Sequence, residues 1–98
     1  MLIAALIRDW ACARNLIEGS TPEKQFIKLM EEAGEVAAAL ARDKQDELID
    51  GLGDMFVVMT ILAAQRGVDI EQCIAQAYAV IKNRKGYMRD GIFIKEGD

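Results

Sequence analysis

The sequence predicts an all-α protein, and two observations support this prediction. Apolar residues recur at helical spacing along four segments, and residues that typically begin or end helices separate those segments. The length of 98 residues, with 52% hydrophobic residues and a single proline, suits one small globular domain. We therefore expect one domain over residues 1–98, built as a four-helix bundle that oligomerises and carries a short hairpin-like tail at its C-terminus.

The first two helices are predicted from capping residues and breaks in the chain. Apolar residues at helical spacing cover residues 2–17, and Gly19 ends this first helix. The string Ser-Thr-Pro-Glu at residues 20–23 then offers an N-cap, a proline in the first turn and an early acidic residue. The second helix is therefore expected to begin here and to continue to about residue 42.

The later elements are predicted in the same way. Asp43 can cap a third helix, which ends just before Gly67. Asp69, with a glutamine three residues later, forms a capping box for a fourth helix that ends with basic residues and Gly86. The remaining tail places an Asp-Gly pair between two short apolar runs, and this pattern favours a hairpin.

The composition excludes several kinds of chemistry. Twelve Lys and Arg residues against sixteen Asp and Glu residues give a formal net charge of -4, which argues against a nucleic-acid partner. The chain contains no His, so Ser-His and Cys-His nucleophiles and a His-ligated zinc are excluded. Any catalysis would therefore have to use carboxylates.

The cysteines and the hydropathy point to neither secretion nor a membrane. Cys12 and Cys73 are far apart and form no C-x-x-C pair, so we expect two buried free thiols in a reducing cytosol. Arg8 and Asp9 interrupt the apolar N-terminal run too early for a signal peptide or a membrane span. We expect a cytoplasmic protein, in the host cytoplasm if it is phage-encoded, with no membrane partner.

The third helix is expected to form an interface between subunits. Residues 54–64 are apolar on every side of a helix, and four short helices can hardly cover such a surface. We therefore expect a homodimer or homotetramer in which these helices pack across subunits.

Acidic residues on the second and third helices lie beside the predicted core. Glu32 and Glu35 are neighbours at the edge of the apolar stripe of the second helix, whereas Glu31 points furthest from that stripe. Three more acids fall within about 60° of one another on the third helix, in line with its apolar residues: Glu47, Asp50 and Asp54.

Carboxylates that face a core need compensation. Burying several unpaired negative charges would cost several kcal/mol each, so either their pKa values rise or a cation binds between them. Carboxylate oxygens suit a hard divalent ion, and we expect Mg²⁺, with Mn²⁺ as the alternative. The competing interpretation is a solvated surface on which nearby cations pair with these acids: Lys28, Arg42 and Lys44. Acids in line with an apolar stripe on two consecutive helices favour the metal site.

Two short motifs bear on the family of the protein. The first is Glu31-Glu32-x-x-Glu35, and the second is Leu52-Gly53-Asp54 in an acidic helix that continues into an apolar run. Together they resemble the MazG family of all-α nucleoside triphosphate pyrophosphohydrolases, over a core of residues 22–85, and small phage-encoded members are the most similar. The resemblance implies Mg²⁺-dependent conversion of a triphosphate to a monophosphate and pyrophosphate. It also implies that Glu32, Glu35 and Asp54 bind the metal.

One position departs from the family pattern. The family has a glutamate three residues before the aspartate of the Leu-Gly-Asp element, where this chain has Gly51. Asp50 and Glu47 are the available substitutes, because both lie on the same helix face as Asp54. Both registers stay open, and Asp50 is ranked above Glu47 as the replacement ligand.

Phosphate cleavage also needs a base and groups that bind the nucleotide. Without His, a carboxylate must accept the proton of the attacking water, and Glu31 and Glu35 are the candidates. Four residues are expected to bind phosphates, in this subunit or in a neighbouring one: Lys82, Asn83, Arg84 and Lys85. Three others are candidates for binding the base: Trp10, Arg14 and Asn15. The alternatives are cations that only stabilise a helix end and a Trp that only packs in the core.

The favoured function is therefore hydrolysis of a (d)NTP, with (d)GTP preferred, in the control of nucleotide pools. A noncatalytic helical dimerisation or adaptor module that keeps the bundle is the main alternative, and Gly51 is the best evidence for it. A carboxylate metal-storage or sensor protein is the third hypothesis.

Overall fold

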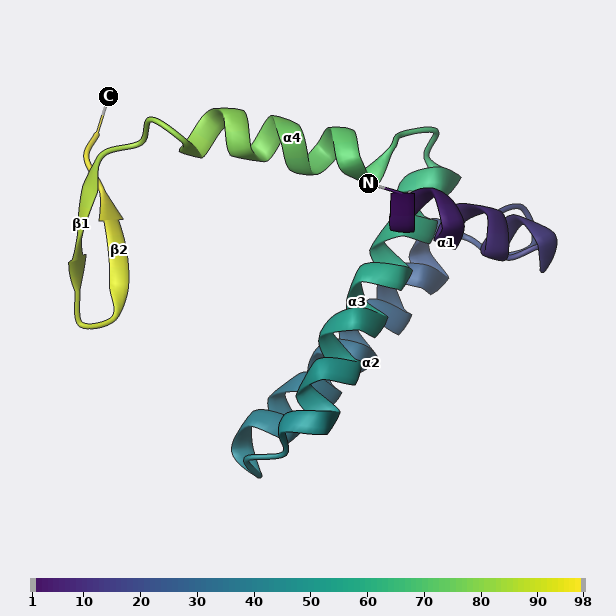
Figure 1. The fold of residues 1–98 in the computed structure, drawn as a ribbon, viewed down its shortest axis with the longest axis horizontal. Coiled ribbons are helices and arrows are strands. Elements are labelled where there is room, and N and C mark those ends of the chain that lie inside the picture. The colour runs from purple at the N-terminus through teal and green to yellow at the C-terminus, as the bar shows by residue number, and fades with distance from the viewer. Residues whose placement is uncertain (1, 98) are drawn as a thin grey trace.

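Four helices and a two-stranded hairpin follow one another in the computed structural model, which describes residues 2–97 (Figure 1). The helices are α1 (Leu2–Ala13), α2 (Pro22–Ala41), α3 (Gln45–Gln65) and α4 (Ile70–Ile81). The strands β1 (Gly86–Arg89) and β2 (Ile92–Lys95) pair antiparallel. The predicted all-α class with a short hairpin-like tail is confirmed.

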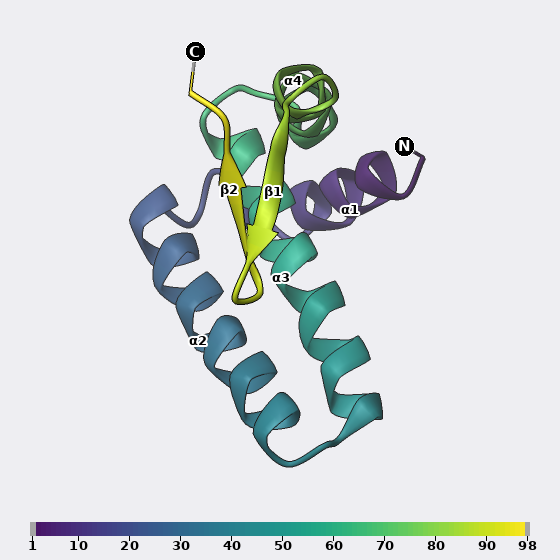
Figure 2. The same ribbon diagram turned by 90° about the vertical axis from the view of Figure 1, so that its left-hand side faces the viewer.

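The α2 and α3 helices form an antiparallel pair joined by a short turn (Figure 2). The side chain of Thr21 caps α2 by accepting the Lys24 N–H at 3.1 Å, and Pro22 follows at the first helical position. In the turn, Asp43 takes a left-handed conformation with φ 55°, so that Lys44 and not Asp43 precedes α3. The short turn places the acidic segments of the two helices side by side.

The core lies where α1, α2 and α3 meet. Its buried apolar residues are Ala4, Ala11, Leu29, Ala39, Val58, Ile61 and Ala63. Thr60 is also fully buried, and its hydroxyl donates to the Phe56 carbonyl at 2.8 Å, so this hydroxyl has a hydrogen-bond partner. Gly51 of α3 is buried against α2, where a Cβ atom would lie 2.7 Å from Cγ2 of Val36. The absence of a side chain at this position allows the two helices to approach closely.

The α3 helix is better covered within one chain than the sequence suggests. None of residues 55–64 is exposed, because α1 and α2 pack on two sides of this helix. Large exposed apolar side chains lie on the other elements and on the first turns of α3, among them Leu6 on α1, Phe26 on α2 and Leu52 on α3. The predicted oligomer is not tested by this packing and stays a prediction.

The α4 helix and the hairpin extend away from the other helices (Figure 1). No residue of α4 is buried. The radius of gyration is 16.1 Å, whereas a compact domain of this length has about 13 Å. The four helices therefore do not close into one compact bundle within a single chain.

Two predicted helix ends and the burial of the cysteines differ from the structure. The first helix ends at Ala13 and not near residue 17, because Asn15 adopts φ 58°. The fourth ends at Ile81, and residues 82–85 lead into the hairpin, where the Glu96 N–H donates to the Lys85 carbonyl at 2.9 Å. Both cysteines, expected to be buried, are exposed, and Cys73 lines an open apolar pocket that also includes Leu29 of α2 and Met59 of α3.

Candidate metal and nucleotide site

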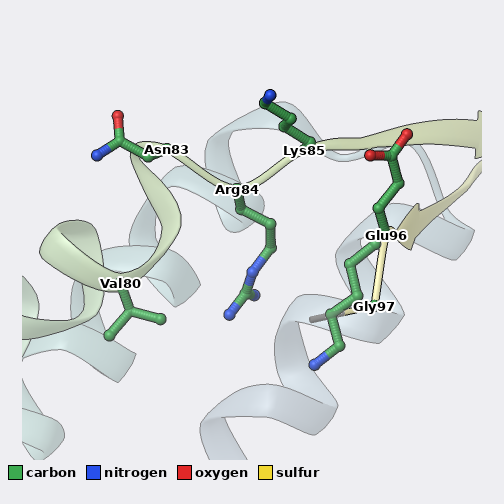
Figure 3. Close-up of a pocket in the computed structure, with 7 residues that line it drawn as sticks. Val80, Asn83, Arg84, Lys85, Glu96 and Gly97 are labelled. Atoms are coloured by element: carbon green, nitrogen blue, oxygen red, sulfur yellow. The ribbon is translucent and has the colours of Figure 1, made fainter.

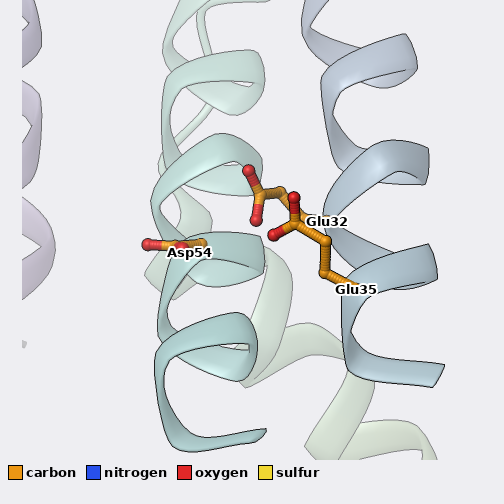
Figure 4. Close-up of side chains that lie close together, drawn as sticks. All are labelled: Glu32, Glu35 and Asp54. Atoms are coloured by element: carbon orange, nitrogen blue, oxygen red, sulfur yellow. The ribbon is translucent and has the colours of Figure 1, made fainter. Parts of the chain in front are cut away.

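Three carboxylates from two helices meet between α2 and α3. Glu32 and Glu35 lie one turn apart on α2 and reach toward α3, which carries Asp54 (Figure 4). One oxygen of each of these three residues lies within 4.8 Å of the others. The structure thus brings together the three acids that the sequence resemblance assigns to the metal.

Glu32 is the most unusual member of this cluster, because it is a buried acid with incomplete pairing. Its relative exposure is 6%. Its Oε1 lies 3.3 Å from Nζ of Lys28, one turn earlier on α2, whereas its Oε2 is buried without any hydrogen-bond partner. A buried carboxylate oxygen without a partner is costly, and a bound cation would remove that cost.

Electrostatics within the cluster follow from the closeness of the acids. The negative charge of Glu32 raises the pKa of Glu35 above its ordinary value, and the charge of Asp54 acts in the same direction. The hydrogen bond to Glu32 and the charge of that carboxylate raise the pKa of Lys28, so that the lysine stays protonated. One lysine is thus the positive counterpart of several acids, and the cluster keeps an excess of negative charge.

Two further acids of α3, Glu47 and Asp50, lie in an open pocket beside the cluster. Its lining residues are Glu35, Ala38, Arg42, Glu47, Asp50, Gly51 and Asp54. Glu47 and Asp50 both line this pocket, so the structure leaves either one in place as a further ligand. Arg42 is the positive residue of the pocket, at the C-terminal end of α2.

Gly51 does not leave room for the side chain of a metal ligand at this position. A side chain there would begin against Val36 of α2, and something would have to shift to make room for its first carbon atom. The glycine is explained by helix packing, which removes the main sequence argument for a lost catalytic residue.

Glu31 lies apart from the cluster, among the residues described. Its side chain is exposed, and its Oε2 lies 4.0 Å from Nζ of Lys28. Lys28 therefore bridges the outward Glu31 and the inward Glu32. From the sequence, Lys28 and Arg42 are expected only as partners of the acids on a solvated surface. The spacing of four residues between Lys28 and Glu32 is nevertheless typical of the contact observed.

An apolar slot adjoins the acidic cluster on the α1 side. It is lined by Ile3, Leu6, Ile7, Trp10, Asp54 and Val57. Trp10 is 46% exposed, so it is not a plain core residue, and the Arg14 guanidinium lies 4.6 Å from the centre of its ring. Asn15 is in the turn after α1, where its carbonyl accepts the Gly19 N–H at 3.0 Å. Trp10 is thus close to the acids through Asp54, and Arg14 is held on its ring.

The basic segment after α4 surrounds a separate hollow (Figure 3). Arg84 points into this hollow, whereas Asn83 and Lys85 point out of it (Figure 3). Lys95 and Glu96 contribute from the end of the hairpin. Lys82 is the C-cap residue of α4. The structure does not bring these residues to the acidic cluster of the same chain, because α4 carries them away from it (Figure 1).

The residues present fit a hard divalent cation. The donor set consists of carboxylate oxygens, which Mg²⁺ and Mn²⁺ prefer, and one of these oxygens is buried without a partner. The same geometry offers no sulfur or imidazole ligand that would favour zinc or copper, since the chain contains no His.

Comparison with known proteins decides the family. The family model described as "MazG nucleotide pyrophosphohydrolase domain" matches residues 20–88. The chain belongs to this family. The MazG resemblance inferred from the acidic segments is therefore confirmed, and the match includes α2, α3, α4 and the three clustered acids.

A phage protein is similar to this MazG domain. It is described as "Uncharacterized 18.2 kDa protein in rep-hol intergenic region" of Haemophilus phage HP1 (strain HP1c1), and it is 57% identical over 63 residues. The aligned stretch is 64% of this chain and 39% of the relative, so the chain spans about two fifths of the length of that protein. No solved structure matches the chain. None of the helices in the described part of the chain has both the length and the apolar character needed to cross a membrane.

Proposed function

We propose that this MazG domain is a Mg²⁺-dependent nucleoside triphosphate pyrophosphohydrolase, which converts a (d)NTP to a (d)NMP and pyrophosphate. The observation that supports this most is the buried, unpartnered Oε2 of Glu32 beside Glu35 and Asp54. Mn²⁺ is the alternative ion, (d)GTP is the favoured substrate, and control of nucleotide pools in the cytoplasm is the favoured role.

Glu32, Glu35 and Asp54 would hold the cation, with Asp50 or Glu47 as a further ligand from the same pocket. When bound, Mg²⁺ would neutralise charge on the phosphate oxygens and would lower the pKa of a water molecule. Arg42 and Lys28 are cations close enough to the acids to contact a phosphate.

We favour Glu35 over Glu31 as the base, because Glu35 is in the cluster and Glu31 points outward. Glu35 accepts the proton of the water whose oxygen attacks the α-phosphorus. The bond from this phosphorus to the bridging oxygen breaks, and pyrophosphate leaves with the electron pair.

The apolar slot beside Asp54 is a suitable place for the base of the nucleotide. Trp10 is 46% exposed and provides an aromatic ring for stacking, and the Arg14 guanidinium already lies over this ring. Because Asp54 lines both the slot and the acidic pocket, one nucleotide could occupy the two at once.

Release of products from a panel of ribo- and deoxynucleoside triphosphates tests this function. The wild-type protein with Mg²⁺ should release pyrophosphate and a monophosphate in equal amounts, without free phosphate. Glu35→Gln and Asp54→Asn should each lose at least about a hundredfold in turnover while their helical circular dichroism is unchanged. Asp46→Asn, an exposed acid in the first turn of α3, is the matched control and should keep full activity. A wild-type protein that hydrolyses none of the panel would instead support the noncatalytic dimerisation or adaptor module.

A further inference from the structure

The two carboxylate oxygens of Glu32 have different surroundings. Oε1 lies 3.3 Å from Nζ of Lys28, whereas Oε2 is buried and has no hydrogen-bond partner. The side chain reaches from α2 toward α3 (Figure 4) and is only 7% exposed. Neighbouring atoms restrain a side chain packed in this way, so the two oxygens do not readily exchange places. One oxygen is therefore paired with a lysine, and the other is the one that can accept a metal ion.

Glu32 differs in this respect from the other two acids of the cluster. Among the three, Glu32 alone is buried, whereas Glu35 and Asp54 are exposed. The exposed carboxylates can rotate and offer one or two oxygens to an ion. The number of oxygens that Glu32 offers is instead set by its fixed neighbours, and the cation beside Oε1 is Lys28.

Lys28 contacts two glutamates on the next turn of α2. Its Nζ lies 3.3 Å from Oε1 of Glu32 and 4.0 Å from Oε2 of Glu31, which follow it by four and three residues. The lysine side chain is 53% exposed, so water screens these ion pairs and their contribution to stability is small. What distinguishes Lys28 from an ordinary surface lysine is that it places a positive charge on one oxygen of a buried metal ligand.

Divalent ions differ in how they use a carboxylate. Mg²⁺ requires nearly octahedral geometry, which the narrow angle of a carboxylate that binds through both oxygens does not suit. Ca²⁺ takes up to about eight oxygens in a flexible arrangement and often binds both oxygens of one carboxylate. Binding of Ca²⁺ to both oxygens of Glu32 would bring the ion to Oε1, where the Lys28 ammonium repels it.

We propose that Lys28 makes the metal site selective against Ca²⁺, because its ammonium group blocks Oε1 of Glu32 and leaves Oε2 as the one oxygen that binds the ion. Lys28 acts here through Glu32 and not by contacting the ion, so it is a specificity-determining residue for the metal. The inference rests on the proposed function for the presence of a divalent ion at this site. Its test uses protein and metal ions alone, so that no turnover is needed.

Competition with Mn²⁺ tests the selectivity. Electron paramagnetic resonance of free Mn²⁺ gives the affinity for this ion, and its displacement by Mg²⁺ or Ca²⁺ gives the other two affinities. Lys28→Met should raise the affinity for Ca²⁺ relative to Mg²⁺ at least about tenfold, because both oxygens of Glu32 become available. Loss of one positive charge strengthens the binding of both ions by a similar factor, so the ratio of the two affinities isolates the geometric effect. Lys28→Arg keeps a cation at this position and should retain the selectivity of the wild type.

Lys24→Met is the matched control, because Lys24 is an exposed lysine one turn earlier on α2. This variant loses the same charge and should keep the wild-type ratio. Lys28→Ala is a second test variant, and circular dichroism checks the helical content of every protein. An unchanged ratio in both neutral Lys28 variants, or an equal change in Lys24→Met, overturns the proposal. A wild-type protein that binds none of the three ions contradicts the proposed metal site itself, which is a different result from an unchanged ratio.

Infrared spectroscopy of the Ca²⁺-loaded proteins gives a signature of the binding mode. The antisymmetric and symmetric stretching bands of a carboxylate lie closer together when both of its oxygens bind one ion. The Ca²⁺ difference spectrum of Lys28→Met should contain such closely spaced bands in addition to those of the wild type, and adding Glu32→Gln should remove them. If the wild-type spectrum already contains closely spaced bands that Glu32→Gln removes, Lys28 does not block Oε1 and the proposal is wrong.

Discussion

Arg8 donates to Oδ1 of Asp69 at 3.0 Å, and the same oxygen accepts the backbone N–H of Glu71 at 2.9 Å. One carboxylate thus connects the N-terminal helix to the start of α4 and caps that helix. The two side chains are 33% and 46% exposed, so solvent weakens the ion pair itself.

Asp69→Ala should lower the free energy of unfolding by about 1 kcal/mol, mainly through loss of the N-cap. Urea denaturation at one fixed protein concentration measures this change. A double-mutant cycle with Arg8→Met should give a coupling below about 1 kcal/mol, because the pair is largely solvated. Asp9→Ala, an exposed neighbour on α1, is the control and should be nearly neutral. A coupling of several kcal/mol would show that the pair is shielded from water, for example by a second subunit.

Substitutions of two adjacent glutamates of α2 should differ in their effect on metal affinity. Glu32→Gln should weaken Mn²⁺ binding at least about tenfold, because Glu32 offers a buried unpartnered oxygen to the cluster. Glu31→Gln should change the affinity little, since its side chain points outward toward Lys28. Electron paramagnetic resonance titration of free Mn²⁺ gives both affinities. Equal effects of the two substitutions would contradict the assignment of the cluster.

The pH dependence of stability should reveal the repulsion between Glu32 and Glu35. Because the folded pKa of Glu35 is raised above its ordinary value of 4.5, the native state binds more protons than the unfolded chain in the interval between the two. Its contribution to the free energy of unfolding therefore falls as pH rises through this interval in metal-free protein. Urea denaturation from pH 4 to about 7 with a chelator, compared with Glu35→Gln, isolates that contribution. Saturating Mg²⁺ should recover the lost stability at the upper end of the range, and its affinity should fall as pH is lowered. A Glu35→Gln curve parallel to the wild-type curve would refute the coupling.

Substitution of alanine for two glycines of α3 should change the stability of the protein in opposite directions. Gly51→Ala should destabilise the protein by about 1–3 kcal/mol, because its Cβ would press on the stiff side chain of Val36. Gly53→Ala should stabilise it by up to about 1 kcal/mol, because a Cβ there meets nothing within 4 Å and alanine favours the helix. Adding Val36→Ala to the first variant should restore part of the loss. Thermal unfolding of the four proteins checks this, and the same sign for both glycines would be inconsistent with the close approach of α2 and α3.

Asp50 and Glu47, the two candidates for a further metal ligand, should differ in how much their substitution lowers activity. Asp50→Asn is expected to reduce pyrophosphate release about as much as Asp54→Asn, because its carboxylate lies one turn from Asp54 in the same pocket. Glu47→Gln should reduce it less. Steady-state turnover at saturating Mg²⁺ compares the three variants, and the reverse order would assign the role to Glu47.

The sequence was sufficient to predict the parts of the fold that depend on local signals. Thr21, Pro22 and Asp69 act as the capping rules require, and the Asp90-Gly91 pair turns the hairpin with both residues at positive φ. The inward position of Glu32 also follows from helical periodicity, because it depends only on spacing within α2.

Features that depend on contacts between elements were not predictable in this way. The exposure of Cys12 and Cys73 depends on how the helices pack against one another, which the spacing within α1 or α4 does not encode. The role of Gly51 depends on the distance to Val36 on another helix, which no spacing within α3 encodes. The hydrogen bond from the Glu96 N–H to the Lys85 carbonyl at the base of the hairpin joins two segments, and no spacing within α4 encodes it.

The short turn between α2 and α3 has a consequence for the order of folding. All three clustered acids belong to one pair of sequential helices, so only a small loop must close to bring them together. Contacts of such low sequence separation form early, and the α2–α3 pair is expected to be structured in the folding transition state. The acids would then repel one another before the rest of the chain has docked, so Mg²⁺ should accelerate refolding rather than act only by slowing unfolding.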